Sequence, residues 1–107
     1  SSDSRVGMAD LPPILFEGKR YQQVLNGERE GQAQRTGLMK VTDLDSGAST
    51  YVSIYDVPRD PGLEADAGDV FFSSFEIDES RREIRIENEH GQRYTYSIDR
   101  RVVSPAN

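Results

Sequence analysis

The chain has 107 residues and a mass of 12.0 kDa, contains no cysteine, and carries a formal net charge of −6 at pH 7. This length predicts a single domain, and the lack of cysteine excludes disulfides, zinc–cysteine sites, iron–sulfur clusters and thiol catalysis. The acidic balance argues against nucleic acid and anionic membranes, which attract clustered Lys and Arg, but is compatible with simple solubility or a basic protein partner.

The first part of the chain predicts a tail and then a short hairpin. Residues 1–10 are expected to be a flexible tail, residues 11–103 a single β-rich domain, and residues 104–107 a flexible C-terminus. Residues 14–17 and 20–25 are predicted strands around Gly18-Lys19. Residues 26–34 are polar and rich in glycine, which predicts a mobile loop.

A second hairpin is predicted from residues 37–44 and 48–55, around a three-residue loop, Asp45-Ser46-Gly47. This register gives the hairpin two apolar faces, because side chains alternate with a period of two. One face carries Met39, Val41 and Tyr51, and the other carries Leu38, Val52 and Ile54. The pattern indicates either inner strands covered on both sides or an edge that meets a partner.

Residues 56–69 hold five carboxylates and one arginine between two strand-like runs. Asp60 is a predicted helix N-cap, Pro61 a predicted first helical residue and Gly68 a predicted helix end. The segment is therefore predicted to be a short capped turn that links two hairpins.

The C-terminal third predicts an antiparallel three-strand meander from residues 70–78, 83–88 and 92–99. A two-residue loop between the last two strands would put the isoleucines and tyrosines on opposite faces. A three-residue loop, 89–91, with Gly91 left-handed instead aligns them. The four-residue turn 79–82 agrees with this register. The predicted buried face consists of Phe71, Phe75, Ile77, Ile84, Ile86, Tyr94, Tyr96 and Ile98.

The same alternation places Val70 and Phe72 on the outer, otherwise polar face of the meander. Two explanations are open: the N-terminal hairpin or residues 56–69 cover them, or they form an apolar patch for a partner. Cover within the chain is the favoured explanation.

Three stretches, GLMKVTDLDSGA (37–48), YDVPRDPGLEADAGDVFF (55–72) and IRIENEHGQRYTYSID (84–99), resemble a family of small uncharacterised bacterial all-β proteins. Their hairpin rhythm also looks like a single β-propeller blade. The resemblance covers about sixty residues, implies no known activity and transfers no functional residue.

Catalytic and metal sites are weakly supported by the sequence. His90, the only histidine, falls in a predicted turn, and no serine lies in a nucleophile motif. Carboxylate catalysis requires a deep apolar cleft, which a thin core without tryptophan does not favour. The arginines at 81–82 and 100–101 are interpreted as surface charge. A solvated acidic loop is preferred to calcium binding at residues 60–69, and hairpin chemistry explains residues 43–47.

The sequence therefore predicts an all-β protein: a small curved antiparallel sheet of five to seven strands with at most one short helical turn. The expected function is non-enzymatic: an accessory, inhibitor-like or interaction module without a cofactor. The protein is expected to be a monomer or a homodimer, and a cytoplasmic location is slightly favoured over a periplasmic one. Alternatives are a calcium-stabilised domain, a self-assembling unit that pairs through residues 37–55, and a small-ligand binder that uses Tyr51 or Tyr94. The predicted partner-binding residues are Asp60, Glu64, Asp66, Asp69 and Phe72.

Overall fold

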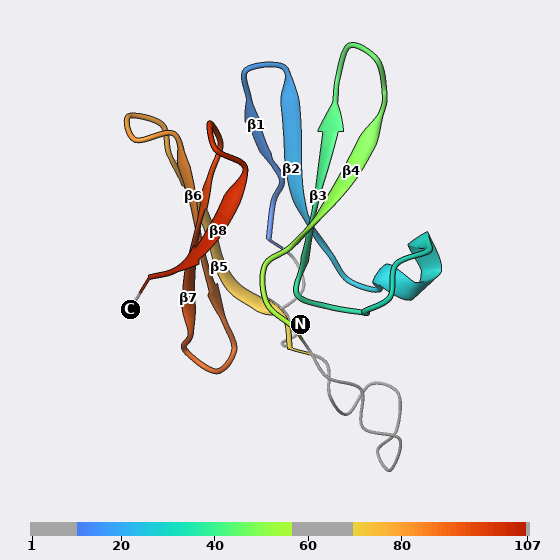
Figure 1. The fold of residues 1–107 in the computed structure, drawn as a ribbon, viewed down its shortest axis with the longest axis vertical. Coiled ribbons are helices and arrows are strands. Elements are labelled where there is room, and N and C mark those ends of the chain that lie inside the picture. The colour runs from blue at the N-terminus through green and yellow to red at the C-terminus, as the bar shows by residue number, and fades with distance from the viewer. Residues whose placement is uncertain (1–10, 57–69, 107) are drawn as a thin grey trace, which may run out of the picture.

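Two four-stranded antiparallel sheets face each other in the computed structural model, which describes residues 11–56 and 70–106 (Figure 1). In the described residues, the first sheet contains β1 (Ile14–Phe16), β2 (Lys19–Val24), β3 (Leu38–Asp43) and β4 (Ser49–Ser53). The second contains β5 (Phe72–Asp78), β6 (Glu83–Asn88), β7 (Arg93–Ser97) and β8 (Val102–Pro105). In both sheets the spatial order follows the chain order.

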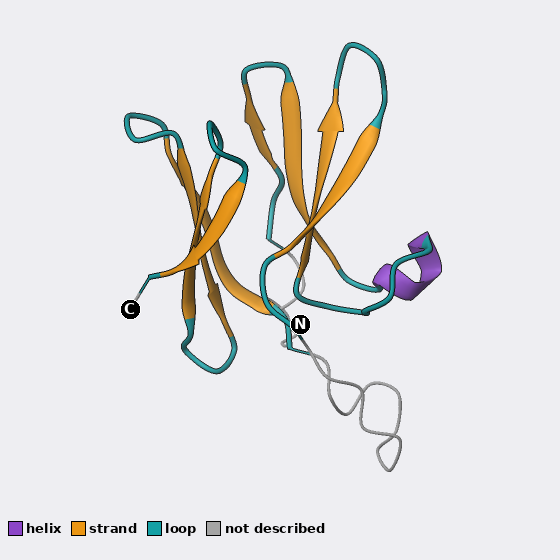
Figure 2. Cartoon of the chain, in the orientation of Figure 1, coloured by secondary structure: helices purple, strands orange, loops and turns teal. Residues whose placement is uncertain are grey.

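The all-β, antiparallel prediction is confirmed, but the prediction of one curved sheet with five to seven strands is wrong. The described residues form eight strands in two sheets, with a single 3₁₀ turn, η1 (Gly27–Glu30), as their only helical element (Figure 2). The physical reason is burial: each sheet has one apolar face, and facing the other sheet removes both from water. The described part of the chain has no helix that is long and apolar enough to cross a lipid bilayer.

The C-terminal sheet has the predicted register. Ile86 lies opposite Tyr94, and Ile77 lies opposite Ile84. The loop between β6 and β7 ends at Gly91, whose φ of 78° is the left-handed conformation that the three-residue loop requires. The turn at 79–82 also forms, although its last residue, Arg82, adopts a left-handed φ of 56° without being a glycine.

A β-bulge at Ser73 reverses the predicted orientation of the residues before it. Phe72 pairs with Asn88 but Ser74 pairs with Glu87, so Ser73 is an extra residue in β5. Its hydroxyl donates to the carbonyls of Glu87 and Asn88 at 3.2 and 3.1 Å.

The expectation that Phe72 lies on the outer face is therefore wrong. Phe72 is fully buried between the sheets, where its N–H donates to Gln23 Oε1 at 2.7 Å. Val70 also packs against the core, whereas Phe71, which was expected in the core, is partly exposed. A single inserted residue causes both changes because side chains alternate with a period of two.

The hairpin of β3 and β4 differs from the prediction by one residue. Asp43 N–H donates to Ala48 O at 2.8 Å, so four residues, 44–47, form the loop. Val52 consequently lies opposite Met39, and Tyr51 lies opposite Lys40 on the outer face. Met39 and Val41 lie in the core, and Leu38, which alternates with them along β3, is also buried. Strand β3 is thus covered on both faces, one of the two alternatives that the sequence left open.

Aromatic side chains join the two sheets in the core. Tyr21 meets Tyr96 with ring centroids 6.4 Å apart, and Tyr55 meets Phe72 at 6.1 Å. Tyr55 Oη also donates to Val70 O at 2.6 Å, which holds together the described residues on either side of 57–69. The buried cluster consists of Tyr21, Met39, Val41, Ile54, Tyr55, Phe72, Phe75, Ile84, Ile86 and Tyr96.

Two further elements lie in segments for which the sequence predicted no regular structure. The segment 26–34, predicted to be a mobile loop, contains η1. Strand β8 includes Ser104 and Pro105, which lie beyond the predicted domain end at residue 103. The helical turn predicted near Asp60 to Gly68 falls outside the described residues.

Candidate functional site

Four hairpin turns lie at one end of the sandwich (Figure 1). We call this the four-turn end: residues 17–18, 44–48, 79–82 and 98–101. Residues of all four turns line a cleft. The cleft has a volume of about 490 Å³, within the range typical of small-ligand sites. It is lined by Glu17, Lys19, Tyr21, Val41, Asp43, Ser46, Ala48, Thr50, Arg82, Tyr96, Ile98, Asp99 and Arg101.

Arg82 holds the rim of the cleft together. Its Nη2 donates to Glu17 Oε1 at 2.7 Å, its Nη1 donates to the other oxygen of the same carboxylate, and its Nε donates to Asp99 Oδ1 at 2.8 Å. The guanidinium also lies 5.4 Å from the centroid of the Phe16 ring. One side chain therefore connects three turns and both sheets through a bidentate ion pair, the geometry in which exposed pairs are most effective.

Acidification is expected to abolish the contribution of the Glu17 ion pair. The hydrogen bond from Arg82 holds the pKa of Glu17 below its ordinary value of 4.5. The ion pair therefore stabilises the fold fully above about pH 4.5, and this stabilisation is lost as the pH falls through the lowered folded pKa. Thermal melts of the native chain and Glu17→Gln should differ at pH 7 and converge as the pH falls below 4.5. A difference that stays constant across this range would contradict the assignment.

Two tyrosines form the floor of the cleft. Tyr21 and Tyr96 are only 2% and 5% exposed. Neither hydroxyl has a hydrogen-bond partner within the described residues, and neither is cut off from solvent. The cleft that they line is therefore the route by which both hydroxyls reach water.

Both phenols remain protonated at neutral pH. Burial raises the pKa of Tyr21 and of Tyr96, and for Tyr21 the proximity of Tyr96 raises it further. Each O–H can therefore donate a hydrogen bond into the cleft. Because both hydroxyls reach water, a ligand that accepts their hydrogen bonds would take the place of water in the cleft.

Lys19 and Arg101 supply positive charge at the cleft. Neither makes an ion pair with a carboxylate in the part of the chain that the structure describes. The positive charge of Arg101 acts on both phenols and opposes the rise in their pKa. Asp43, in contrast, accepts hydrogen bonds from the backbone N–H groups of Asp45 and Ser46, at 2.9 and 3.2 Å, which lower its pKa.

Backbone strain is concentrated at the same place. The non-glycine residues with positive φ in the described ranges are Glu17 (51°), Arg82 (56°) and Arg101 (59°), and all three line the cleft. Such conformations cost of order 1–3 kcal/mol each and tend to occur at functional sites. The strain is a second, independent feature that marks the four-turn end.

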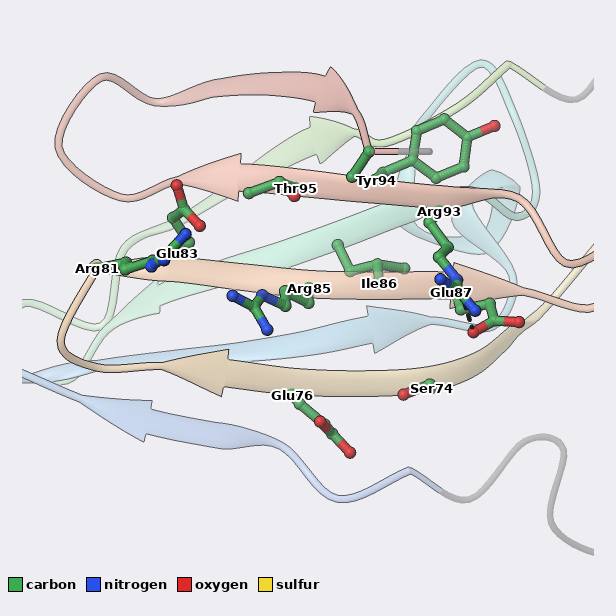
Figure 3. A pocket seen from close by; sticks show the side chains of 11 residues that line it. Ser74, Glu76, Arg81, Glu83, Arg85, Ile86, Glu87, Arg93, Tyr94 and Thr95 are labelled. Atoms are coloured by element: carbon green, nitrogen blue, oxygen red, sulfur yellow. Dashed lines mark ion pairs between the residues drawn. The ribbon is translucent and has the colours of Figure 1, made fainter.

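A second pocket, which we call the furrow, has a volume of about 460 Å³ and lies on the outer face of the second sheet (Figure 3). It is lined by Ser74, Glu76, Arg81, Glu83, Arg85, Ile86, Glu87, Arg93, Tyr94, Thr95 and Ala106. Its charges largely satisfy one another: Arg93 Nε lies 3.5 Å from Glu87 Oε1, and Arg85 Nη2 lies 3.0 Å from Asp78 Oδ2. The side chains stand out from a regular strand face, as predicted for the polar side of the meander (Figure 3). This surface is explained as a solvated sheet face.

Of the five predicted site residues, the structure describes only Phe72. Asp60, Glu64, Asp66 and Asp69 lie outside the described residues, so an acidic contact surface or calcium site there remains a prediction. Phe72 is buried, and a ring in that position presents no surface to a partner. Among the described residues, no group of three or more metal-ligating side chains is placed to hold an ion.

Other functional candidates are placed clearly. His90 is exposed in the turn between β6 and β7, as predicted. Tyr94 lines the furrow, whereas Tyr51 donates from the outer face of the first sheet to Glu30 Oε1 at 2.6 Å. The ligand-binding alternative, which named Tyr51 or Tyr94, remains a prediction.

The cleft was missed because it is assembled from four turns that are distant in sequence. One signal was present: Glu17, Arg82 and Arg101 each occupy the turn position where glycine is common. The chain matches no protein-family model, no curated protein and no solved structure. The resemblance to small bacterial all-β proteins therefore remains a prediction.

Proposed function

We propose that this protein is a non-enzymatic binding module that holds a ligand group in the cleft at the four-turn end. The observation that carries the proposal is the pair of nearly buried phenols, Tyr21 and Tyr96, which line an open cleft without hydrogen-bond partners in the described residues. Binding sites typically combine apolar walls with a few fixed polar groups, and this cleft has both.

The electrostatics of the cleft favour binding over catalysis. A general acid or base works best with a pKa near the operating pH. Here the shifted groups move away from neutrality: the pKa of Glu17 is lowered, and those of Tyr21 and Tyr96 are raised. These side chains keep their ordinary protonation states at pH 7, which suits fixed donors and ion pairs.

A rigid rim supports the same proposal. The network around Arg82 fixes three turns relative to one another, so the ligand does not have to order them on binding. Preorganisation of this kind improves affinity by lowering the entropy cost of association. The hairpin turns would serve as binding loops on a rigid sandwich.

A fragment screen by NMR tests the proposal. We expect hits to shift the backbone signals of Thr50 and Ile98, which line the cleft from different sheets. The double variant Tyr21→Phe/Tyr96→Phe should weaken them about tenfold, since one to two net hydrogen bonds are lost. Tyr51→Phe, which removes a hydroxyl from the outer face, is the matched control. The proposal would be contradicted if the fragments bound the double variant as tightly as the native chain, or if their signals mapped to the furrow.

The acidic segment is a second candidate contact surface. The hydrogen bond from Tyr55 Oη to Val70 O supports it, because it fixes the described residues on both sides of 57–69. The same screen, repeated with Asp60, Glu64, Asp66 and Asp69 changed to amides, distinguishes the two surfaces. If the variant with the four amide substitutions loses binding and the tyrosine double variant keeps it, the acidic segment is the binding surface.

A further inference from the structure

We propose that the ligand group in the cleft is a single carboxylate on a small apolar body. Its oxygens accept hydrogen bonds from the phenols of Tyr21 and Tyr96 and from the guanidinium of Arg101. This inference rests on the proposed function and specifies the chemical class of its ligand. It follows from the donors that the cleft presents, from its charge balance and from its apolar walls.

The available donors match an oxyanion acceptor. Tyr21 and Tyr96 offer O–H groups that have no partner among the described residues, and Arg101 offers N–H groups of a guanidinium that no described carboxylate neutralises. A carboxylate has two oxygens with about four acceptor positions and no donor of its own. Charge-assisted hydrogen bonds from arginine are also roughly twice as strong as neutral ones.

The charge balance selects one negative charge rather than two. The lining contains three cations, Lys19, Arg82 and Arg101, and three carboxylates, Glu17, Asp43 and Asp99. Arg82 is already engaged by two of those carboxylates. Lys19 also attracts Glu17 and Asp43, so the lining carries no net positive charge. A dianion such as phosphate would therefore meet twice the carboxylate repulsion that a monoanion meets.

The remaining lining predicts what the carboxylate is attached to. Val41, Ala48 and Ile98 form apolar wall alongside the two phenol rings. An aromatic or branched aliphatic body would bury its surface there, with a gain of roughly 25 cal/mol per Å² of apolar area. Two sources present this chemistry: a free organic acid and the carboxyl terminus of a peptide with an apolar last residue.

The test is an NMR titration of the full chain at pH 7 and low salt with phenylacetate and with its neutral isostere, phenylacetamide. We expect phenylacetate to shift the signals of Thr50 and Ile98, and phenylacetamide to bind at least fivefold more weakly. Arg101→Gln should weaken phenylacetate by at least fivefold. The matched control is Arg100→Gln, which removes an adjacent exposed arginine that does not line the cleft.

A second pair of probes separates the two sources. A tripeptide ending in phenylalanine is titrated with a free and with an amidated C-terminus. A preference for the free peptide over phenylacetate assigns the cleft to a chain terminus, and the reverse assigns it to small acids; both support a carboxylate site. If Arg101→Gln does not fold, Tyr96→Phe takes its place with the same expected loss.

Two results would overturn the inference in distinguishable ways. If the amide and carboxylate probes shift the cleft signals equally, the ligand is not selected by its charge, and the proposed binding function stands without the carboxylate. The same conclusion follows if Arg101→Gln binds phenylacetate as the native chain does. If none of the four probes nor any fragment shifts the cleft signals, both the carboxylate inference and the proposed function fail.

Discussion

Phe72→Ala is expected to lower the free energy of unfolding by about 3–5 kcal/mol, the usual cost of truncating a buried aromatic side chain. Phe72 is fully buried, and its ring lies 5.6 Å from that of Phe75 and 6.1 Å from that of Tyr55. Its removal leaves a cavity where the two sheets meet, and neighbours on regular strands can collapse into it only partly. Urea unfolding followed by circular dichroism measures the change.

The matched control is the preceding residue. Phe71→Ala removes the same ring from a partly exposed position outside the buried cluster, so we expect a loss of about 1 kcal/mol, typical of a point mutation away from the core. The order of these two losses tests the bulge at Ser73 directly. If Phe71→Ala proved more destabilising than Phe72→Ala, the strand would be regular and the predicted alternation would be correct.

Gly37→Ala is the second substitution with a large expected effect, about 2–5 kcal/mol of lost stability. Gly37 has a φ of 79°, which costs an L-residue roughly 1–2 kcal/mol. A Cβ at this position would also lie 2.4 Å from the backbone oxygen of Tyr55 and 3.0 Å from its ring. Backbone must move to relieve this contact, and such overpacking costs roughly 1–3 kcal/mol more.

Gly91→Ala separates the two contributions. Gly91 has nearly the same φ, 78°, but a Cβ there would meet nothing within 4 Å. We expect a loss of about 1–2 kcal/mol, from the left-handed conformation alone. Denaturant unfolding gives the stability lost in each variant. The difference between the two losses is the cost of the contact between a Cβ at position 37 and Tyr55. Equal losses would show that the approach to Tyr55 contributes nothing.

The C-terminal meander was predictable because two independent local signals agree there. The left-handed glycine at 91 fixes the loop length, and the alternation of Ile84 and Ile86 with the tyrosines fixes the face. When turn chemistry and hydrophobic pattern specify the same register, few alternatives remain. The polar outer face, with Glu87 opposite Arg93, followed from the same reasoning.

The two register predictions that failed were each wrong by a single residue. Nothing local distinguishes a bulge at Ser73 from a regular strand, and Phe72 appeared on the wrong face in consequence. At β3 and β4 the choice between a three- and a four-residue loop depended on the hydrogen bonds that Asp43 accepts. Because side chains alternate between the two faces of a strand, an error of one residue in the register moves every affected side chain to the opposite face.

The sequence by itself determined the class of this protein: antiparallel β-structure, the positions of seven of the eight described strands to within a few residues, and the register of β6 with β7. These depend on local alternation and turn residues, which a short window contains. Only the tertiary structure decided that there are two sheets, that Phe72 is buried and that four turns enclose a cleft. Contacts such as Arg82 with Glu17 join residues 65 positions apart, and no local pattern encodes which distant surfaces meet. The cleft and its unpartnered phenols exist only because the sheets face each other.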